Sequence, residues 1–214
     1  MENRKTFLRK LIMMAMLSAM AYMLMLVARV PVVLFLKYEP KDVIITIGGF
    51  LFGPMASFII SFVVSLLEMV TISDTGIIGG IMNLISTCSF ACVAAFIYKK
   101  QHTLKGAILG LGLGSLLMVA IMLLWNWLIT PLYMGVDRAT VEGMLIPAFL
   151  PFNLLKAGLN SALTIGLYKP LSTALRRIGL VETHAKSSKT GVYLFSGALL
   201  ITCILLLLVL QGKL

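Results

Sequence analysis

A lysine in the middle of an apolar segment is the residue of this sequence best suited to recognising a polar ligand. Lys156 lies within residues 145–167, between Asn153 and Asn160. The i, i+3, i+7 spacing puts these side chains on one face of a helix. The segment is long enough to span a bilayer, where a charge is costly and usually faces a cavity, partner or ligand. The pattern predicts a polar recognition stripe, with snorkelling or packing against a carboxylate as the structural alternative.

Three further residues are predicted to join Asn153, Lys156 and Asn160. Asn126 and Trp127 come near the end of an apolar run, and Tyr38 lies in a charged loop. Asparagine and lysine donate to carbonyl oxygens and ring nitrogens, while aromatic rings stack on a planar ligand. The set therefore suits a planar, polar small molecule. The alternative for Trp127 is a place in the aromatic belt at the membrane interface.

The composition of the chain places it among integral membrane proteins. Of its 214 residues, 60% are hydrophobic and 12% are charged, which is typical of a chain that resides in a bilayer. The net charge of +10 does not indicate nucleic acid, because the basic residues gather between apolar runs. Cys88, Cys92 and Cys203 lie in apolar runs with no His or acidic cluster beside them, so we predict neither a disulfide framework nor a metal site.

The apolar runs predict an all-α membrane protein with seven helices. The predicted helices are residues 11–28, 43–52, 55–70, 77–98, 104–129, 145–167 and 192–210. The second is too short to span a bilayer alone, and Pro54 is placed to begin the third. The first helix has the basic flank and small residues of a signal peptide. Its apolar run continues to Val33, which favours a retained helix.

The segments between these helices are expected to be loops. Residues 29–42 mix apolar, aromatic and charged side chains, which suits a cap on the membrane surface. Residues 68–74 are predicted to form an acidic loop that contains Glu68 and Asp74. Residues 133–143 are predicted to form a polar loop, and residues 169–189 a basic connector with an amphipathic stretch.

The distribution of Lys and Arg predicts a cytoplasmic N-terminus. With that orientation most basic residues fall on the inner side, where the positive-inside rule puts them. The inner segments hold Arg4, Lys5, Arg9, Lys10, Lys99, Lys100, Lys105, Lys169, Arg176, Arg177, Lys186 and Lys189. The acidic and aromatic loops then lie on the outer face, and the seventh span would leave the C-terminus outside.

Small residues recur at four-residue spacing on several predicted helices, which allows close helix packing in lipid. The pairs and runs are Ala15 and Ala19, Ser57 with Ser61 and Ser65, Ala91 and Ala95, and Gly110 and Gly114. Packing within the chain explains most of them, although an external membrane partner could use one. The sequence has no Gly-rich loop that ends in Lys-Ser or Lys-Thr. Uphill transport would thus need ATP hydrolysed by another chain, or a coupling ion bound here.

Three motifs in order carry a family resemblance across residues 8–175. They are KYEPKD at 37–42, IGGFLFGP at 47–54 and PFNLLK at 151–156. With them the chain resembles the substrate-binding (S) components of energy-coupling-factor (ECF) vitamin transporters, most closely the riboflavin-specific type. The Ala15 and Ala19 pattern is also similar to the coupling motif of that family.

The resemblance implies a riboflavin-binding subunit in a prokaryotic plasma membrane. It implies a six-helix domain at residues 1–175 with the vitamin near its outer face. The sequence departs from that six-helix pattern afterwards, with a connector at 176–190 and an extra helix at 191–214. Asn153 and Lys156 would hydrogen-bond the flavin ring, and Ala15 and Ala19 would contact a transmembrane coupling protein served by two ATPases. No catalytic residue, metal or cofactor is expected, because riboflavin would be the cargo.

Three other functions remain open at this stage. An S component for thiamine, pantothenate or a folate would share the architecture. A small membrane enzyme could use Glu68, Asp74 or Lys156, provided that a pair of catalytic groups lies within hydrogen-bond reach. A structural or assembly subunit would leave the outer cavity empty.

Overall fold

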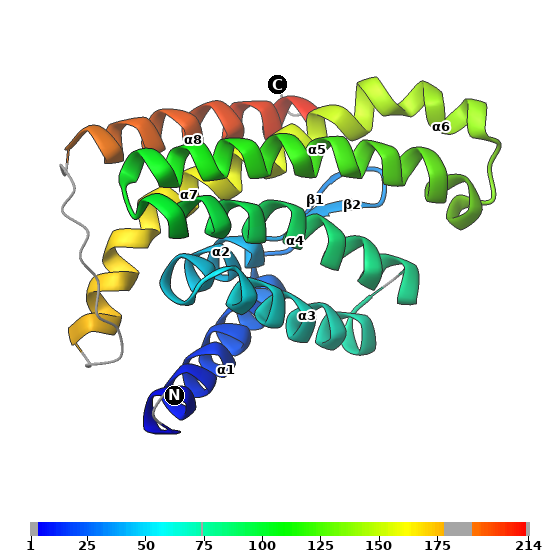
Figure 1. Cartoon of the computed structure of the whole chain (residues 1–214). Coiled ribbons are helices and arrows are strands. Elements are labelled where there is room, and N and C mark those ends of the chain that lie inside the picture. The colour runs from blue at the N-terminus through cyan, green and yellow to red at the C-terminus, as the bar shows by residue number, and fades with distance from the viewer. Residues whose placement is uncertain (1–3, 74, 178–189, 213–214) are drawn as a thin grey trace.

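The computed structural model describes residues 4–73, 75–177 and 190–212. Figure 1 shows a bundle of long helices with one small hairpin among them. In chain order the elements are α1 (Arg4–Val27), β1 (Val30–Val33), β2 (Leu36–Tyr38), α2 (Lys41–Phe52), α3 (Pro54–Thr71), α4 (Gly76–Gln101), α5 (Leu104–Met134), α6 (Arg138–Met144), the π-helix η1 (Leu145–Phe149), α7 (Leu150–Arg177) and α8 (Thr190–Leu210).

The helices have the inside-out polarity of a membrane protein. Within the described residues, α1, α3, α4 and α5 are each long and apolar enough to cross a bilayer. On α3, Ser57 and Ser61 are buried, whereas Phe58 and Phe62 are exposed. Small polar residues inside and large apolar residues outside are what close helix packing in lipid requires. The prediction of an all-α membrane protein is confirmed.

Residues 30–38 form a β-hairpin within the loop predicted at 29–42, and Lys41 and Asp42 already belong to α2. Strands β1 and β2 are antiparallel, with Val30 opposite Tyr38 and Val33 opposite Leu36. The turn between them holds Leu34 at a φ of 52°. The β-branched residues of β1 favour this extended conformation. A two-stranded hairpin is marginal alone in water, so its stability depends on the helices that it packs against.

The break between α2 and α3 falls where the sequence predicts it. Gly53 has a φ of +94°, which a side chain rarely tolerates. Pro54 follows at the first position of α3, where its missing N–H costs no helical hydrogen bond. Helix α2 is almost wholly buried, and it holds the segment from Lys41 onward in the interior.

Helices α4 and α5 pack with their backbones in close approach. A Cβ at Gly110 would lie 2.7 Å from the Ala94 carbonyl oxygen, and one at Gly114 would lie 2.5 Å from that of Phe90. Only glycine fits at such contacts. The small residues on these helices therefore pack within the chain, as predicted.

The chain after residue 129 is more helical than predicted. Helix α5 continues through Pro131 and ends at Gly135, which adopts a left-handed conformation with a φ of 65°. The expected polar loop at 133–143 instead contains most of α6, where Asp137 caps the helix by accepting from the Thr140 backbone N–H at 3.3 Å. Pro131 therefore does not end α5, although a proline in a helix removes one backbone hydrogen bond.

A π-helical turn, η1, joins α6 to α7. The Leu150 backbone N–H donates to the Leu145 carbonyl oxygen, five residues back. Pro147 and Pro151 have no N–H to offer to the usual four-residue ladder. The wider turn accommodates them, and such turns are frequent at functional sites.

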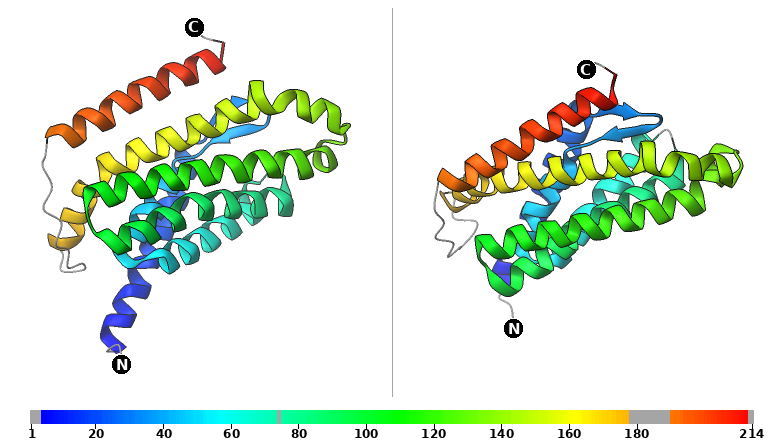
Figure 2. Two further views of the ribbon diagram at one scale, coloured as in Figure 1. Left: turned by 45° about the horizontal axis from the view of Figure 1, so that its top comes forward. Right: turned by 90° about the horizontal axis from the view of Figure 1, so that it is seen from above.

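Helix α8 lies alongside α7 in both views of Figure 2, which agrees with the predicted extra helix after the core. Most of the predicted connector at 176–190 lies outside the described residues, as does Asp74.

Candidate functional site

A cavity of about 280 Å³ lies beneath the hairpin, close to the lower end of the roughly 300–1,000 Å³ typical of small-molecule pockets. Its walls come from the hairpin and its flanks and from α3, α4, α5 and α7. The lining residues are Arg29, Phe35, Leu36, Lys37, Glu39, Glu68, Thr75, Met82, Asn83, Ser86, Met122, Asn126, Tyr133, Phe152, Asn153 and Lys156.

Lys156 lies on the cavity wall and is held by an ion pair. Its Nζ is 3.3 Å from Asp42 Oδ2 and donates to Ser86 Oγ at 3.1 Å. Asp42 also accepts from Asn160 Nδ2 at 3.1 Å and from Thr87 Oγ1 at 2.7 Å. Both members of the pair are buried, so the low local dielectric strengthens their attraction. We call Lys156, Asp42, Asn160, Thr87 and Ser86 the lysine–aspartate network.

Two asparagines line the cavity on separate helices. Asn153 Nδ2 donates to the carbonyl oxygen of Phe149, the last residue of η1, at 2.8 Å. Asn126 Nδ2 donates to the Met122 carbonyl oxygen at 2.7 Å, and its Oδ1 accepts from Thr130 at 2.9 Å. Each amide nitrogen carries two hydrogens. These bonds fix both side chains and leave each a second N–H to donate to a ligand.

Tyr38 and Asn160 stand behind the cavity rather than on its wall. Tyr38 donates from its hydroxyl to Asn160 Oδ1 at 3.0 Å, and Asn160 in turn donates to Asp42. Burial, followed by the charge of Asp42, raises the pKa of Tyr38, so its hydroxyl remains a donor. The i, i+3, i+7 spacing places Asn160 on the correct helix face, but its amide is bonded to Asp42.

Trp127 lies away from this group. Its Nε1 donates to Glu142 Oε1 at 2.8 Å, and the Arg138 guanidinium lies 4.8 Å from its ring centroid. Both partners belong to α6, which the sequence did not predict. Trp127 thus fixes α6 against α5.

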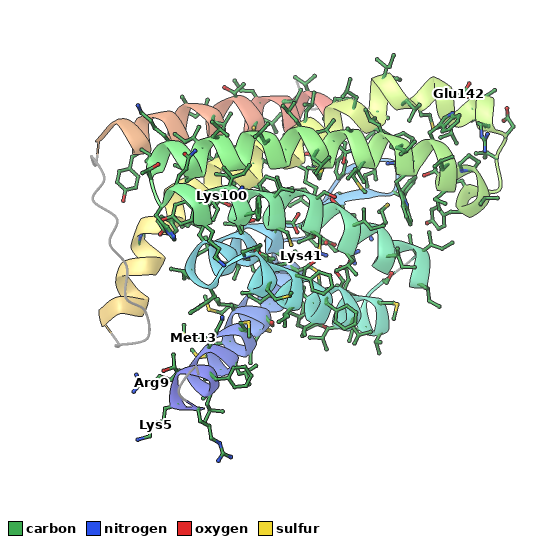
Figure 3. The ribbon with its side chains drawn as sticks, in the orientation of Figure 1. Lys5, Arg9, Met13, Lys41, Lys100 and Glu142 are labelled. Atoms are coloured by element: carbon green, nitrogen blue, oxygen red, sulfur yellow. The ribbon has the colours of Figure 1, made fainter. Side chains whose placement is uncertain are left out.

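A second group of buried charges adjoins the cavity, and we call it the four-charge network. Glu39 forms ion pairs with two cations: its Oε1 is 2.8 Å from Arg29 Nε and its Oε2 is 2.7 Å from Lys41 Nζ. Lys41 also pairs with Glu68, which accepts from Asn83 Nδ2 at 2.7 Å. Lys41 is fully buried, and Figure 3 places it in the interior, far from Lys5 and Arg9 at the tip of α1.

Glu68 corrects the expectation of an acidic loop at 68–74. It belongs to α3 and is 1% exposed. The missed signal is its register: Glu68 follows Ser65 by three residues and so continues the buried face of Ser57, Ser61 and Ser65. Its carboxylate is held in an ion pair, which disfavours the role in catalysis that the sequence left open.

The charged side chains of these two networks are paired with one another. Arg29, Lys41 and Lys156 are matched by Glu39, Glu68 and Asp42, each within an ion pair. Charges away from water persist when they are paired in this way. Lys37 also lines the cavity.

A family model described as the substrate-specific component of ECF transporters matches residues 9–168. The chain belongs to this family. The matched residues run from α1 to within α7, so they include the hairpin and every wall of the cavity. The family resemblance predicted from the three motifs is confirmed.

Curated relatives of this S component include two riboflavin transporters. RibU of Staphylococcus aureus (strain TCH60) is 29% identical over 180 residues, which cover 79% of this chain and 94% of the relative. FmnP of Bacillus subtilis (strain 168) is 29% identical over 161 residues, covering 69% and 84%. A solved S component of a bacterial ECF transporter matches with a TM-score of 0.66 and 30% identity, over 78% of this chain and 98% of that one.

The two alanines predicted to contact a partner lie on the exposed surface of this S component. Ala15 and Ala19 are exposed on α1, whereas Leu17 and Ala21 on the same helix are buried. The α4 alanines Ala91 and Ala95 are buried instead. The alanine pair on α1 is therefore left uncovered by the described part of the chain and presents a small-residue surface to the membrane.

Proposed function

We propose that this S component binds riboflavin in the cavity beneath the hairpin and delivers it for uptake. Its ATP-hydrolysing partners would reside on other chains. The names of its curated relatives support riboflavin as the ligand. One observation carries the assignment to the cavity. Lys156, Asn153 and Asn126 reach it from two helices, α5 and α7, and all three are anchored by other bonds.

The chemistry of riboflavin matches these groups. Its ring presents carbonyl oxygens and ring nitrogens, which Lys156 and the two asparagine amides can satisfy. A charge-assisted hydrogen bond of this kind contributes roughly 1.5–3 kcal/mol. Phe35, Tyr133 and Phe152 also line the cavity, and they supply aromatic surface for a planar ring.

Coupling would take place on the opposite side of the molecule from α8. Ala15 and Ala19 would contact a transmembrane coupling protein, through which two ATPases drive uptake. The N-terminus would lie in the cytoplasm of a prokaryote. Lys100 and Glu142 lie toward opposite ends of the bundle in Figure 3, so the basic end of α4 would be inside and the cavity outside, as the positive-inside rule favours.

The test is the visible absorption spectrum of the chain purified in detergent from a rich culture. We expect a yellow sample whose chromophore is released on denaturation and co-migrates with riboflavin. A colourless sample that also fails to quench added riboflavin fluorescence would contradict the proposal. Direct binding of labelled thiamine, pantothenate and folate would then identify the vitamin that this cavity accepts.

A further inference from the structure

Helix α8 lies beyond the residues that match the family model, which end at 168, yet it packs tightly on the core. A Cβ at Gly158 would come within 2.6 Å of Cys203 Sγ. Ser196 Oγ donates to the Ala162 carbonyl oxygen at 2.7 Å. A close contact and a hydrogen bond at separate turns of α8 fix its position along α7, in the way that small residues fix helix pairs in membranes.

The C-terminal end of α8 reaches the hairpin. Gln211 Nε2 donates to the Pro31 carbonyl oxygen at 2.8 Å. A run of leucines packs against the cluster that includes Val32, Leu36 and Tyr38 of the hairpin; it comprises Leu206, Leu207 and Leu210. Helix α8 contacts β1, and the right-hand view of Figure 2 shows the C-terminal end of α8 beside the hairpin.

The hairpin forms one wall of the cavity through Phe35, Leu36 and Lys37. Two strands alone are only marginally stable, so the partners of the hairpin govern how readily it moves. We propose that α8 is a strap that holds the hairpin against α7 and thereby slows the exchange of ligand in the cavity. The effect on exchange rests on the proposed function, whereas the effect on the hairpin does not.

The test compares variants of the full-length chain in detergent. Leu207→Ala/Leu210→Ala/Gln211→Ala removes the hydrogen bond to the hairpin and truncates two leucines that pack on the cluster containing Val32, Leu36 and Tyr38. Leu205→Ala is the matched control, because Leu205 is exposed on the other side of α8. Gln211→Ala alone removes one exposed hydrogen bond and leaves the apolar packing intact, so it remains informative if the triple variant does not fold.

Two measurements decide the proposal. Amide hydrogen exchange across residues 30–38 should be faster in the triple variant and unchanged in Leu205→Ala. Riboflavin release, followed by recovery of its fluorescence, should speed up by at least about fivefold in the triple variant, because weaker packing around a bound ligand acts mainly on its dissociation rate.

Each contrary result has a separate meaning. Hairpin exchange that stays slow in the triple variant, or in Gln211→Ala if the triple variant does not fold, would overturn the strap. Faster hairpin exchange with unchanged riboflavin release would overturn its control of the ligand. A wild-type chain that binds no riboflavin would refute the proposed function, and hydrogen exchange would still decide whether α8 restrains the hairpin.

Discussion

The central residue of the site is half of an ion pair. The position of Lys156 in an apolar segment marks it in the sequence, but its 3.3 Å contact is with Asp42, a residue more than a hundred positions earlier. The pair serves two purposes. It removes the cost of an isolated buried charge, and it holds the ammonium of Lys156 at the wall of the cavity. The ion pair is therefore a structural role of Lys156 that is compatible with the proposed role of the same lysine in ligand recognition.

These two roles can be separated by a double-mutant cycle. Asp42→Asn leaves Lys156 buried without its counter-charge, and breaking such a pair costs roughly 3–5 kcal/mol. We expect a clear fall in the unfolding temperature in detergent. Lys156→Met should weaken riboflavin binding by at least about tenfold. It should cost less stability, because Asp42 keeps Thr87 and Asn160 as donors.

The double variant provides the decisive comparison. Asp42→Asn/Lys156→Met has no buried charge left in the network, so its unfolding temperature should recover toward that of the native chain while its riboflavin affinity stays low. Unchanged affinity in Lys156→Met would show that Lys156 donates no hydrogen bond to the ligand. An Asp42→Asn variant as stable as the native chain would refute the role of the pair in folding.

The predicted residues of α7 that line the cavity share a simple origin. Asn153 and Lys156 can be found because one helix period relates them. Glu39 and Lys41 pair with each other within the KYEPKD motif. The other partners of this motif, Arg29, Glu68 and Lys156, come from distant parts of the chain, which no local period encodes. Trp127 was predicted to join the ligand site, but its partners lie on α6. The polar composition of residues 133–143 does not predict that helix.

At the scale of elements, the apolar helices and the break between α2 and α3 were predictable, whereas the hairpin, α6 and η1 were not. A segment that faces lipid must be apolar and helical, so the hydropathy of the sequence reveals it. The hairpin, α6 and η1 depend instead on tertiary contacts. The hairpin packs on α7 and α8, α6 is fixed by Trp127, and η1 adapts to Pro147 and Pro151. Such short elements do not contain enough residues for a periodic pattern of apolar side chains to predict them.

The close approach of α4 and α5 gives a test at this scale. Gly114→Ala would place a methyl group 2.5 Å from the Phe90 carbonyl oxygen, so the helices must separate. We expect a lower unfolding temperature in detergent. Gly112→Ala is the matched control, because a Cβ at Gly112 meets nothing within 4 Å and alanine favours a helix. Equal unfolding temperatures for the two variants would show that the contact contributes nothing to stability.

At the scale of the whole molecule, the cavity and the outward alanine pair occupy different places. The cavity lies between the hairpin and the helices α3, α4, α5 and α7, whereas Ala15 and Ala19 lie on the outer side of α1. Binding and coupling can therefore be altered independently. The strap on α8 is on a further side of the bundle, so it restrains the hairpin without covering the alanine pair.

This separation predicts a variant that binds but does not transport. Ala15→Trp/Ala19→Trp places two large rings on an exposed face, where lipid accommodates them and a close-packed helix partner cannot. Riboflavin affinity in detergent should be unchanged, and uptake of labelled riboflavin by cells that carry the energising module should be lost. Ala120→Trp is the control, because Ala120 is exposed on α5, and uptake should persist. Uptake that survives the double substitution would place the coupling surface elsewhere, whereas loss of binding as well would mean that α1 supports the cavity.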